Sequence, residues 1–554
     1  MTVERLARHP RLPKPAGPIV LCILDGVGWG ARDGGDAVHL ARTPHLDALW
    51  RGCPTRTLRA HGTAVGLPSD ADMGNSEVGH NALGAGRVFE QGAALVNQAI
   101  ASGRLFAGEA WRWLVEPLRS TGTLHLCGLL SDGNVHAHLD HVLAIVRRAA
   151  GDGVRRVRVH ALADGRDVQD PSFEHYLALL QAVAGEVADL GCDAQVASGG
   201  GRMAITMDRY EADWSMVERG WRLHVHGDGE LFPSVDAALR TLRARPGGAS
   251  DQTLGGFVIA DAGGPVGAVL DGDAFVLWNF RGDRAIELSK AFEQGGEFCG
   301  FERGRRPAVR FAGMMQYDGD LHLPARFLVE PPAIDRTLGV FLAALELRSF
   351  AVSETQKFGH VTYFWNGNKS GVLAPEVERY AEVPSDRVSF DRAPEMKAEQ
   401  ITDAMLSALN ETPQFQFLRC NLANGDMVGH TGDLGATVRA VEAVDRQVGR
   451  LREAVLARNG ILVVTADHGN ADDMWMRDGK GRPILRPDGS VLPKTSHTLA
   501  PVPLTICDAR SPAPWRLRAD LPQAGLAHVA ATLLHLLGYE APGDYAPSLV
   551  DAAA

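Results

Sequence analysis

The sequence predicts an α/β protein with two domains, one of them inserted into the other. Short apolar runs end at Asp, Asn or Gly and alternate with helical patterns such as 436–459, as is typical of buried parallel strands. The chain has 554 residues, whereas a single hydrophobic core stops growing at roughly 250–300 residues. Candidate ligand side chains come from both ends of the chain and flank a long middle segment, which indicates an insertion.

Each expected strand is an apolar run, and most of these runs lead into polar residues. The runs outside the middle segment are 19–24, 415–420 and 461–464, and those inside it are 123–130, 157–162 and 274–280. We expect an outer domain of residues 1–91 and 332–554 and an inserted domain of residues 92–331, with hinges near 91 and 331. The stiff pair Pro331-Pro332 suits the second junction.

Composition excludes several classes of protein. The net charge of −11 disfavours nucleic acid and anionic membranes as partners. The seven cysteines are scattered and form no CxxC, so we expect buried thiols in a reducing compartment rather than disulfides or a zinc ribbon. No apolar run approaches the 18 or so residues of a membrane span, and the run 19–24 is too short for a signal peptide. We therefore expect a cytoplasmic protein.

Four segments carry carboxylates and imidazoles that suit divalent metals. Asp426 and His430 are four residues apart, so both side chains can face one way on a helical turn, and His497 can complete a three-ligand set. Asp467 and His468 are adjacent at the end of one expected strand, and Asp25 ends another. Such ligands suit Mn, Mg or Zn, and two metals about 4 Å apart can clamp a transferring phosphoryl group. Any one segment alone can equally be a structural turn.

Ser76 is a candidate nucleophile in Gly74-Asn75-Ser76-Glu77. Its structural interpretation is an N-cap serine. Its functional interpretation uses the same position, because the amide groups at a helix N-terminus stabilise a phosphoserine. A serine hydroxyl needs a base or a metal to activate it, and the neighbouring sequence offers no base.

The middle segment repeats arginine beside aspartate and glycine at expected strand ends. Arginine binds phosphate and carboxylate in a bidentate manner, although a single pair is more often a surface ion pair. Arg281 and Arg284 are three apart, which predicts one face of a helical turn. The candidate contacts to an anionic substrate are His136, Arg166, Asp167, Arg202, Arg209, Arg281 and Arg284, together with Lys357 near the second junction.

The ordered set of motifs resembles the cofactor-independent phosphoglycerate mutases, which need no 2,3-bisphosphoglycerate, over about residues 18–545. The motifs are LDGVGWG, DMGNSEVGH, SDGNVHAH, DGRD, GRMAITMDR, NFRGDR, KFGHVTYFWNG, NGDMVGHTGD, TADHGNADDM and TSHT. Some of them, such as TADHG, mark the wider alkaline-phosphatase-like superfamily. Asn134, Ala137, Gly282 and Ser496 depart from the commoner family pattern, but no ligand or cation is lost.

The resemblance implies an alkaline-phosphatase-like domain with an inserted α/β transferase domain, and a monomer. It implies one metal held by Asp426, His430 and His497 and a second held by Asp25, Ser76, Asp467 and His468. Manganese is the expected metal, with Mg, Co or Zn as alternatives. Ser76 becomes the phosphoserine in the interconversion of 3-phosphoglycerate and 2-phosphoglycerate, while the middle-segment residues and Lys357 hold the substrate. Asp167 is expected to move protons, and the domains are expected to close and exclude water.

Two rival interpretations stay open at this point. A phosphomonoesterase or a phosphopentomutase shares the metal ligands, but neither explains the DGRD and NFRGDR segments. A non-catalytic metal-binding protein requires a degenerate site, whereas the ligand set here is intact.

Overall fold

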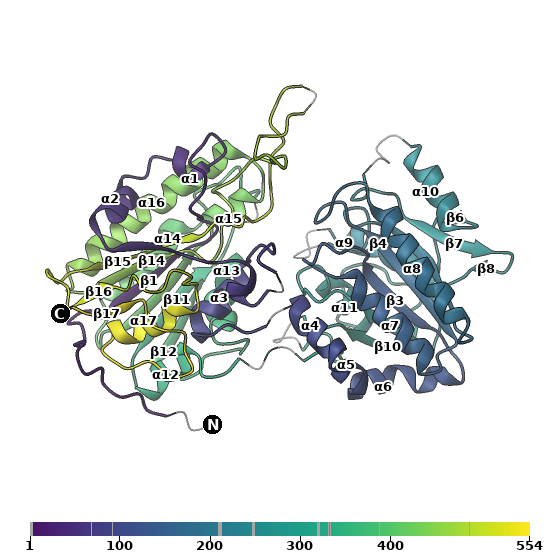
Figure 1. Ribbon diagram of the computed structural model, residues 1–554, viewed down its shortest axis with the longest axis horizontal. Helices are drawn as coiled ribbons and strands as arrows, with labels where there is room; N and C mark the ends of the chain where they lie inside the picture. Colours follow the sequence, from purple (N-terminus) through teal and green to yellow (C-terminus); the bar gives the residue numbers. More distant parts are fainter. Residues whose placement is uncertain are drawn as a thin grey trace. The chain divides into compact units, whose positions relative to one another are not determined.

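The chain divides into two compact units, Met1–Glu90 with Ala333–Ala554 (unit 1) and Gln91–Pro332 (unit 2). The structure, a computed structural model, describes residues 4–67, 69–90, 92–208, 213–245, 250–317, 322–330, 332, 334–386, 388–486 and 488–553 (Figure 1). These borders lie one residue from the junctions expected from the sequence. The expected hinge positions 91 and 331 fall outside the described residues.

Unit 1 combines the beginning and the end of the chain. Its strands are β1 (Ile19–Leu24), β2 (Thr55–Leu58), β11 (Ser349–Glu354), β12 (Glu378–Val383), β13 (Phe417–Leu422), β14 (Ile461–Thr465), β15 (Val502–Asp508), β16 (Trp515–Leu517) and β17 (Val550–Ala552). Its helices are α1 (Ala37–Leu40), α2 (Pro44–Gly52), η1 (Gly62–Val65), α3 (Ser76–Ala85), α12 (Leu338–Ala344), α13 (Thr355–Gly359), η4 (His360–Phe364), α14 (Ala398–Leu409), α15 (Asn424–Gly429), α16 (Leu434–Leu456) and α17 (His528–Leu536).

The main sheet of unit 1 is built around β1, in the order β12-β11-β13-β1-β14-β15-β2. Ile19 pairs in parallel with Phe417 of β13 on one side and with Ile461 of β14 on the other. Every residue of β1, β13 and β14 is buried, as expected of apolar strands with helices on both faces. β15 pairs antiparallel with both β14 and β2, and β2 forms that edge of the sheet.

Helices cover the sheet of unit 1 and bury its core. α14 and α16 contact each other and the central strands, while α3 contacts α17 and η4. The pattern over 436–459 correctly predicts α16, which starts two residues earlier because the Asp433 carboxylate caps it by accepting from the backbone N–H of Ala436. Among the described residues, no helix combines the length and apolar composition that crossing a membrane requires.

Unit 2 is continuous in sequence. Its strands are β3 (Leu124–Leu129), β4 (Arg156–Ala163), β5 (Asp193–Gly201), β6 (Leu231–Phe232), β7 (Phe257–Asp261), β8 (Gly264–Pro265), β9 (Ala274–Leu277) and β10 (Arg310–Gly313). Its helices are α4 (Gly92–Ala101), α5 (Arg104–Ala107), α6 (Glu109–Val115), η2 (Pro117–Arg119), α7 (Leu139–Gly151), α8 (Phe173–Ala188), α9 (Trp214–Trp221), η3 (Arg222–His226), α10 (Val235–Arg243) and α11 (Ile286–Glu293).

The sheet of unit 2 has the order β10-β9-β3-β4-β5-β7-β6, and β10, β9, β3, β4 and β5 run parallel. The apolar runs 123–130 and 157–162 correctly predict β3 and β4. The run 274–280 is longer than β9, which ends at Leu277, because the Asn279 side chain takes over the pairing and accepts from the backbone N–H of Leu129 at 3.0 Å. The run 415–420 likewise begins too early, since β13 starts at Phe417 and continues to Leu422.

A chain of buried polar side chains crosses the core of unit 2 from β3 to η3. Its links are Asp273 Oδ2 to His125 Nε2 (3.2 Å), His125 Nδ1 to His160 Nε2 (3.1 Å), His160 Nδ1 to Ser198 Oγ (2.7 Å), Ser198 Oγ to His224 Nδ1 (2.7 Å) and His224 Nε2 to Thr206 Oγ1 (2.9 Å). Burial lowers the pKa of His125, brings that of His224 to about 3 and holds that of His160 far below its usual range. The three imidazoles are therefore neutral at neutral pH.

We expect these histidines to make unit 2 sensitive to acid. The unfolded chain has imidazole pKa values of about 6.5 and takes up protons before the folded protein does. Their contribution to stability is therefore complete above pH ~6.5 and is lost as pH falls from there towards the folded pKa, by up to about 1.4 kcal/mol per pH unit for each histidine. Hydrogen exchange of the β3 and β4 amides between about pH 5 and 7.5 measures this slope.

A matched pair of variants isolates the histidine contribution to that slope. His224→Asn should remove one histidine's share of the pH dependence. His39→Asn, at an exposed position in unit 1, should leave it unchanged. Equal slopes in both variants and the unaltered chain would show that the buried imidazoles do not set the acid limit of unit 2.

Candidate metal centre

The candidate metal ligands of unit 1 gather beyond the carboxyl ends of its parallel strands. Asp25 follows β1, Asp467 and His468 follow β14, and Asp426 lies on α15 after β13. β1 lies between β13 and β14, so the three strand ends meet at one edge of the sheet. Segments that are distant in the sequence thus place their side chains together.

Ser76 is the first residue of α3, and Asn75 caps this helix in its place. The Asn75 side-chain oxygen accepts from the backbone N–H groups of Glu77 and Val78 at 3.0 and 3.1 Å. The interpretation of Ser76 as an N-cap serine is therefore wrong. Its hydroxyl points instead to His468, whose Nε2 lies 2.9 Å from Ser76 Oγ.

The side chains of His430 and His497 converge on Asp426. Its Oδ1 lies 3.1 Å from His430 Nε2 and 3.2 Å from His497 Nε2, and these two nitrogens are 3.1 Å apart. Each imidazole donates its Nδ1–H to a backbone carbonyl, that of Thr495 at 2.6 Å and that of Gly74 at 2.7 Å. The converging Nε2 atoms therefore carry lone pairs, the arrangement that metal-binding histidines adopt.

A second group consists of Asp25, Asp467 and His468, whose ligand atoms lie within 4.8 Å of one another. Asp467 Oδ2 is buried and has no hydrogen-bond partner among the described residues. His468 also belongs to a group with Asp426 and His497, so it joins the two clusters. Carboxylates and imidazoles with a buried, unsatisfied oxygen fit hard divalent cations.

Lys357, on α13 directly after β11, brings a cation into this cluster. Its ammonium donates to Ser76 Oγ at 2.5 Å, Asp426 Oδ2 at 2.7 Å and Asp25 Oδ1 at 3.1 Å. Burial alone would lower the pKa of Lys357, but the carboxylates of Asp25, Asp426 and Asp467 outweigh it and raise that pKa. Lys357 is therefore charged and touches the oxygen of the candidate nucleophile.

The pKa values of Asp25 and Asp426 are shifted in opposite directions. Burial, reinforced by the nearby Asp467 carboxylate, raises the pKa of Asp25 to about 6. Burial also opposes ionisation of Asp426, but Lys357 and His430 more than compensate and hold its pKa well below the usual range. A concentration of negative charge in a site that excludes water attracts cations, which fits the donor set described above.

Sequence reasoning missed three side chains that orient these ligands. Asn421 donates to Asp25 Oδ2 at 2.6 Å, and Asn470 donates to Asp426 Oδ1 at 3.1 Å. His80 donates from Nδ1 to the Ser76 carbonyl at 2.8 Å and lies 3.4 Å from Asp467 Oδ2. The sequence does carry a signal for each, since both asparagines follow or end apolar strands and His80 lies one helical turn after Ser76.

The candidate substrate residues of unit 2 also follow parallel strands. Arg202 comes directly after β5 and is fully buried, and its guanidinium bonds Asp164 at 2.7 Å and contacts Asp167, both beyond β4. Burial would raise the pKa of Asp167, but Arg202 and His136 outweigh it and lower that pKa. Arg166 is exposed, and its backbone N–H donates to Asp164 Oδ1 at 3.1 Å.

The remaining candidates lie on the loops after β3 and β9. Asp283 Oδ1 is 3.3 Å from both His136 Nδ1 and Arg281 Nε, and this acid was not predicted as a site residue. The prediction that Arg281 and Arg284 share a helical turn is wrong. α11 begins only at Ile286, and Arg284 donates to the Met207 carbonyl at 2.6 Å. Arg209 lies outside the described residues.

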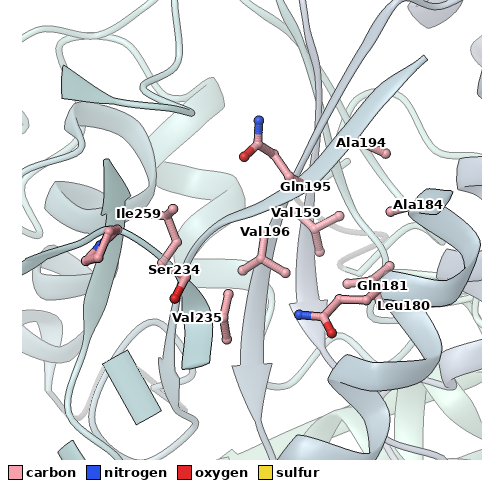
Figure 2. A pocket seen from close by; sticks show the side chains of 11 residues that line it. Val159, Leu180, Gln181, Ala184, Ala194, Gln195, Val196, Ser234, Val235 and Ile259 are labelled. Atoms are coloured by element: carbon pink, nitrogen blue, oxygen red, sulfur yellow. The ribbon is translucent and has the colours of Figure 1, made fainter. Parts of the chain in front are cut away.

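A separate pocket of about 230 Å³ lies between α8, β5 and the start of α10. Figure 2 shows its largely apolar lining, which includes Val159, Leu180 and Val196. It contains none of the predicted site residues, so we assign it no part in the chemistry.

Comparisons with known proteins agree with this geometry. The model of the metalloenzyme superfamily matches residues 17–541. A 2,3-bisphosphoglycerate-independent phosphoglycerate mutase of Trypanosoma brucei brucei is 54% identical over 99% of both chains. A probable enzyme of this type from Arabidopsis thaliana is 51% identical over 99% of this chain and 98% of its own.

A solved structure extends the match to three dimensions. The phosphoglycerate mutase of Leishmania mexicana, determined at low cobalt concentration, superposes with a TM-score of 0.86 at 52% identity and covers 99% of this chain and 100% of its own. This match confirms the predicted two-domain α/β class. The chain belongs to the metalloenzyme superfamily and, within it, to the 2,3-bisphosphoglycerate-independent phosphoglycerate mutases.

Proposed function

We propose that this chain interconverts 3-phosphoglycerate and 2-phosphoglycerate, a step of glycolysis and gluconeogenesis, through a phosphoserine at Ser76 and without 2,3-bisphosphoglycerate. The main support is the position of Ser76 Oγ, 2.5 Å from Lys357 Nζ and 2.9 Å from His468 Nε2, between two groups of metal ligands. Family membership supports the substrate.

We propose that two divalent cations, most simply Mn²⁺, are held by the ligands of unit 1. One set comprises Asp426, His430 and His497, and the other comprises Asp25, Ser76, Asp467 and His468. The carboxylate–imidazole chemistry and the inward Nε2 atoms fit either Mn²⁺ or its neighbours Mg²⁺, Co²⁺ and Zn²⁺. When bound, such cations supply Lewis acidity to the phosphate and to the serine oxygen.

Ser76 is the attacking group in this proposal. Its Oγ gives up its proton and forms a bond to phosphorus, and the bond from phosphorus to the glycerate oxygen breaks. That oxygen takes up one proton, so the number of protons is unchanged. Lys357, which already donates to Ser76 Oγ, stabilises the negative charge of the transferring phosphoryl group. The reverse transfer to the other glycerate hydroxyl completes the isomerisation.

Unit 2 is proposed to bind the glycerate. The proposed contacts that supply positive charge for phosphate and carboxylate are Arg166, Arg202, Arg209, Arg281 and Arg284. His136, whose pKa burial lowers to about 4, adds a neutral hydrogen-bond donor. Asp167, whose lowered pKa keeps it ionised, is proposed to accept a proton from a glycerate hydroxyl. Ser76 belongs to unit 1 and the proposed glycerate contacts belong to unit 2. We therefore propose that the units close during transfer and exclude water. We also propose that the enzyme acts as a cytoplasmic monomer.

An assay coupled to enolase tests the proposal. With Mn²⁺ and without 2,3-bisphosphoglycerate, we expect conversion of 3-phosphoglycerate to 2-phosphoglycerate. Added isotope-labelled free glycerate should stay out of the product, because bound glycerate is retained between the two transfers. Labelled product would show that glycerate leaves, and release of inorganic phosphate without 2-phosphoglycerate would favour the rival phosphomonoesterase.

A further inference from the structure

Two cysteines face each other where β15 approaches the end of α2. β15 and β2 pair antiparallel from Val502–Leu58 to Thr505–Thr55. The ladder continues one residue further, since the backbone N–H of Ile506 donates to the Pro54 carbonyl at 3.1 Å. The same register, carried one more residue, places Cys507 opposite Cys53.

The geometry of this pair suits a disulfide. Thr55 Oγ1 and Thr505 Oγ1 lie 2.9 Å apart, so the side chains of that pair touch on one face. Cys53, two residues before Thr55, and Cys507, two residues after Thr505, point to the same face. They form a pair without backbone hydrogen bonds, whose Cα atoms typically lie about 4.5 Å apart, within the range of about 4.4–6.8 Å that disulfides span.

The surroundings of the pair favour a reactive thiolate. Cys53 is partly exposed, whereas Cys507 is buried, and both are free thiols that contact each other. The Cys53 S–H and the Arg452 guanidinium on α16 overcome burial and lower the pKa of Cys507 to about 6, while the pKa of Cys53 is raised. The pair therefore gives up one proton near neutral pH, and the thiolate is the reactive form of cysteine.

Asp508 is the acidic group that opposes this effect. It is bonded to Arg510 at 2.7 Å and to the Trp515 indole N–H at 2.8 Å. Its charge is thus compensated away from the cysteines, which leaves Arg452 as the cation that faces Cys507.

We propose that Cys53 and Cys507 form a reversible redox pair that closes to a disulfide on reaction with hydrogen peroxide. The Cys507 thiolate attacks one peroxide oxygen and the O–O bond breaks. Hydroxide departs, and Cys507 becomes a sulfenic acid. The Cys53 sulfur then attacks the Cys507 sulfur, the S–O bond breaks, and the hydroxyl departs with the Cys53 proton as water. In total, two thiols and one peroxide give one disulfide and two waters.

The pair is remote from the metal ligands. Cys507 lies beside Leu462 near the start of β14, whereas Asp467 and His468 follow the end of that strand. A disulfide here joins the end of α2 to β15 without touching a ligand. We therefore expect oxidation to raise thermal stability and to leave the metal content unchanged.

The chain offers its own internal comparison. Cys22 and Cys420 also pair in register, on β1 and β13, but both are fully buried. The neighbouring Cys420 thiol, together with burial, raises the pKa of Cys22. This second pair should react with peroxide at least about tenfold more slowly than Cys53 and Cys507, because Cys22 stays protonated and both sulfurs are shielded from solvent.

The test uses the full-length, Mn²⁺-loaded protein with Cys299→Ser, which removes an exposed thiol. After hydrogen peroxide treatment, free thiols are alkylated and the peptides are mapped by mass spectrometry. We expect a Cys53–Cys507 cross-link, a higher midpoint of thermal unfolding and reversal of both by dithiothreitol. With Cys53→Ser, dimedone should instead label a sulfenic acid on Cys507.

Three results on the protein without substitutions would overturn the proposal. They are full alkylation of Cys53 and Cys507 after peroxide, over-oxidation of Cys53 with Cys507 intact, and a cross-link only between Cys22 and Cys420. Each is read from the folded protein without either serine variant, so poor folding of a variant cannot obscure the outcome.

Discussion

Ser76→Ala is expected to lower the turnover number by about 10⁴-fold or more, because the change removes the atom that receives the phosphoryl group. The other ligand side chains and Lys357 stay in place. Metal binding should therefore persist, and the fold should be retained. The measurement is the enolase-coupled assay, together with mass spectrometry of the protein quenched during turnover. A phosphorylated peptide that contains Ser76 is expected in the unaltered enzyme and absent from the variant.

Ser69→Ala is the matched control for this prediction. Ser69 lies on the same stretch of chain, is exposed, and makes local turn contacts with Ala71 and Asp72. It should keep full activity. Retention of a tenth of the normal rate by Ser76→Ala would exclude Ser76 as the nucleophile.

Removal of divalent metal should abolish mutase activity, and added Mn²⁺ should restore it. Without cations, the carboxylates of Asp25, Asp426 and Asp467 repel an incoming phosphate. Lys357 and the histidines then have to offset this repulsion alone. The expected loss is at least about 10³-fold, the size of the effect of removing a principal electrostatic stabiliser from an active site. Chelation followed by gel filtration and the coupled assay measures it.

Metal content and stability give readouts that do not depend on activity. We expect two Mn²⁺ per chain and a higher unfolding midpoint in the loaded protein. His430→Ala should lose one metal, whereas His138→Ala, which changes a histidine of unit 2 that belongs to neither proposed ligand set, should lose none. Full activity in protein shown to be metal-free would contradict the proposed chemistry.

The sequence predicts the strands that position the metal ligands because those strands are apolar along their whole length. Buried parallel strands such as β1 and β14 need apolar residues on both faces, so each appears as an unbroken run that stops where a ligand begins. The spacing of Asp426 and His430 likewise reveals their common direction on α15. These features are local and can be seen without coordinates.

Contacts between distant segments could not be predicted in the same way. Nothing local to Asp283 shows that it meets His136, because Asp283 follows β9 whereas His136 follows β3. The cap of α3 depends on a choice between adjacent Asn75 and Ser76, which both suit an N-cap. The turn before α11 fails to form a helical face because Arg284 instead bonds the Met207 carbonyl.

The order of the two units along the sequence also affects how the chain folds during synthesis. β1 leaves the ribosome before unit 2, whereas both of its sheet neighbours, β13 and β14, are synthesised after unit 2. Unit 2 is one uninterrupted stretch and is complete before either neighbour has been synthesised. Since domains fold as they emerge, unit 2 should reach its native state first, while β1 stays without its two sheet neighbours until they have been synthesised.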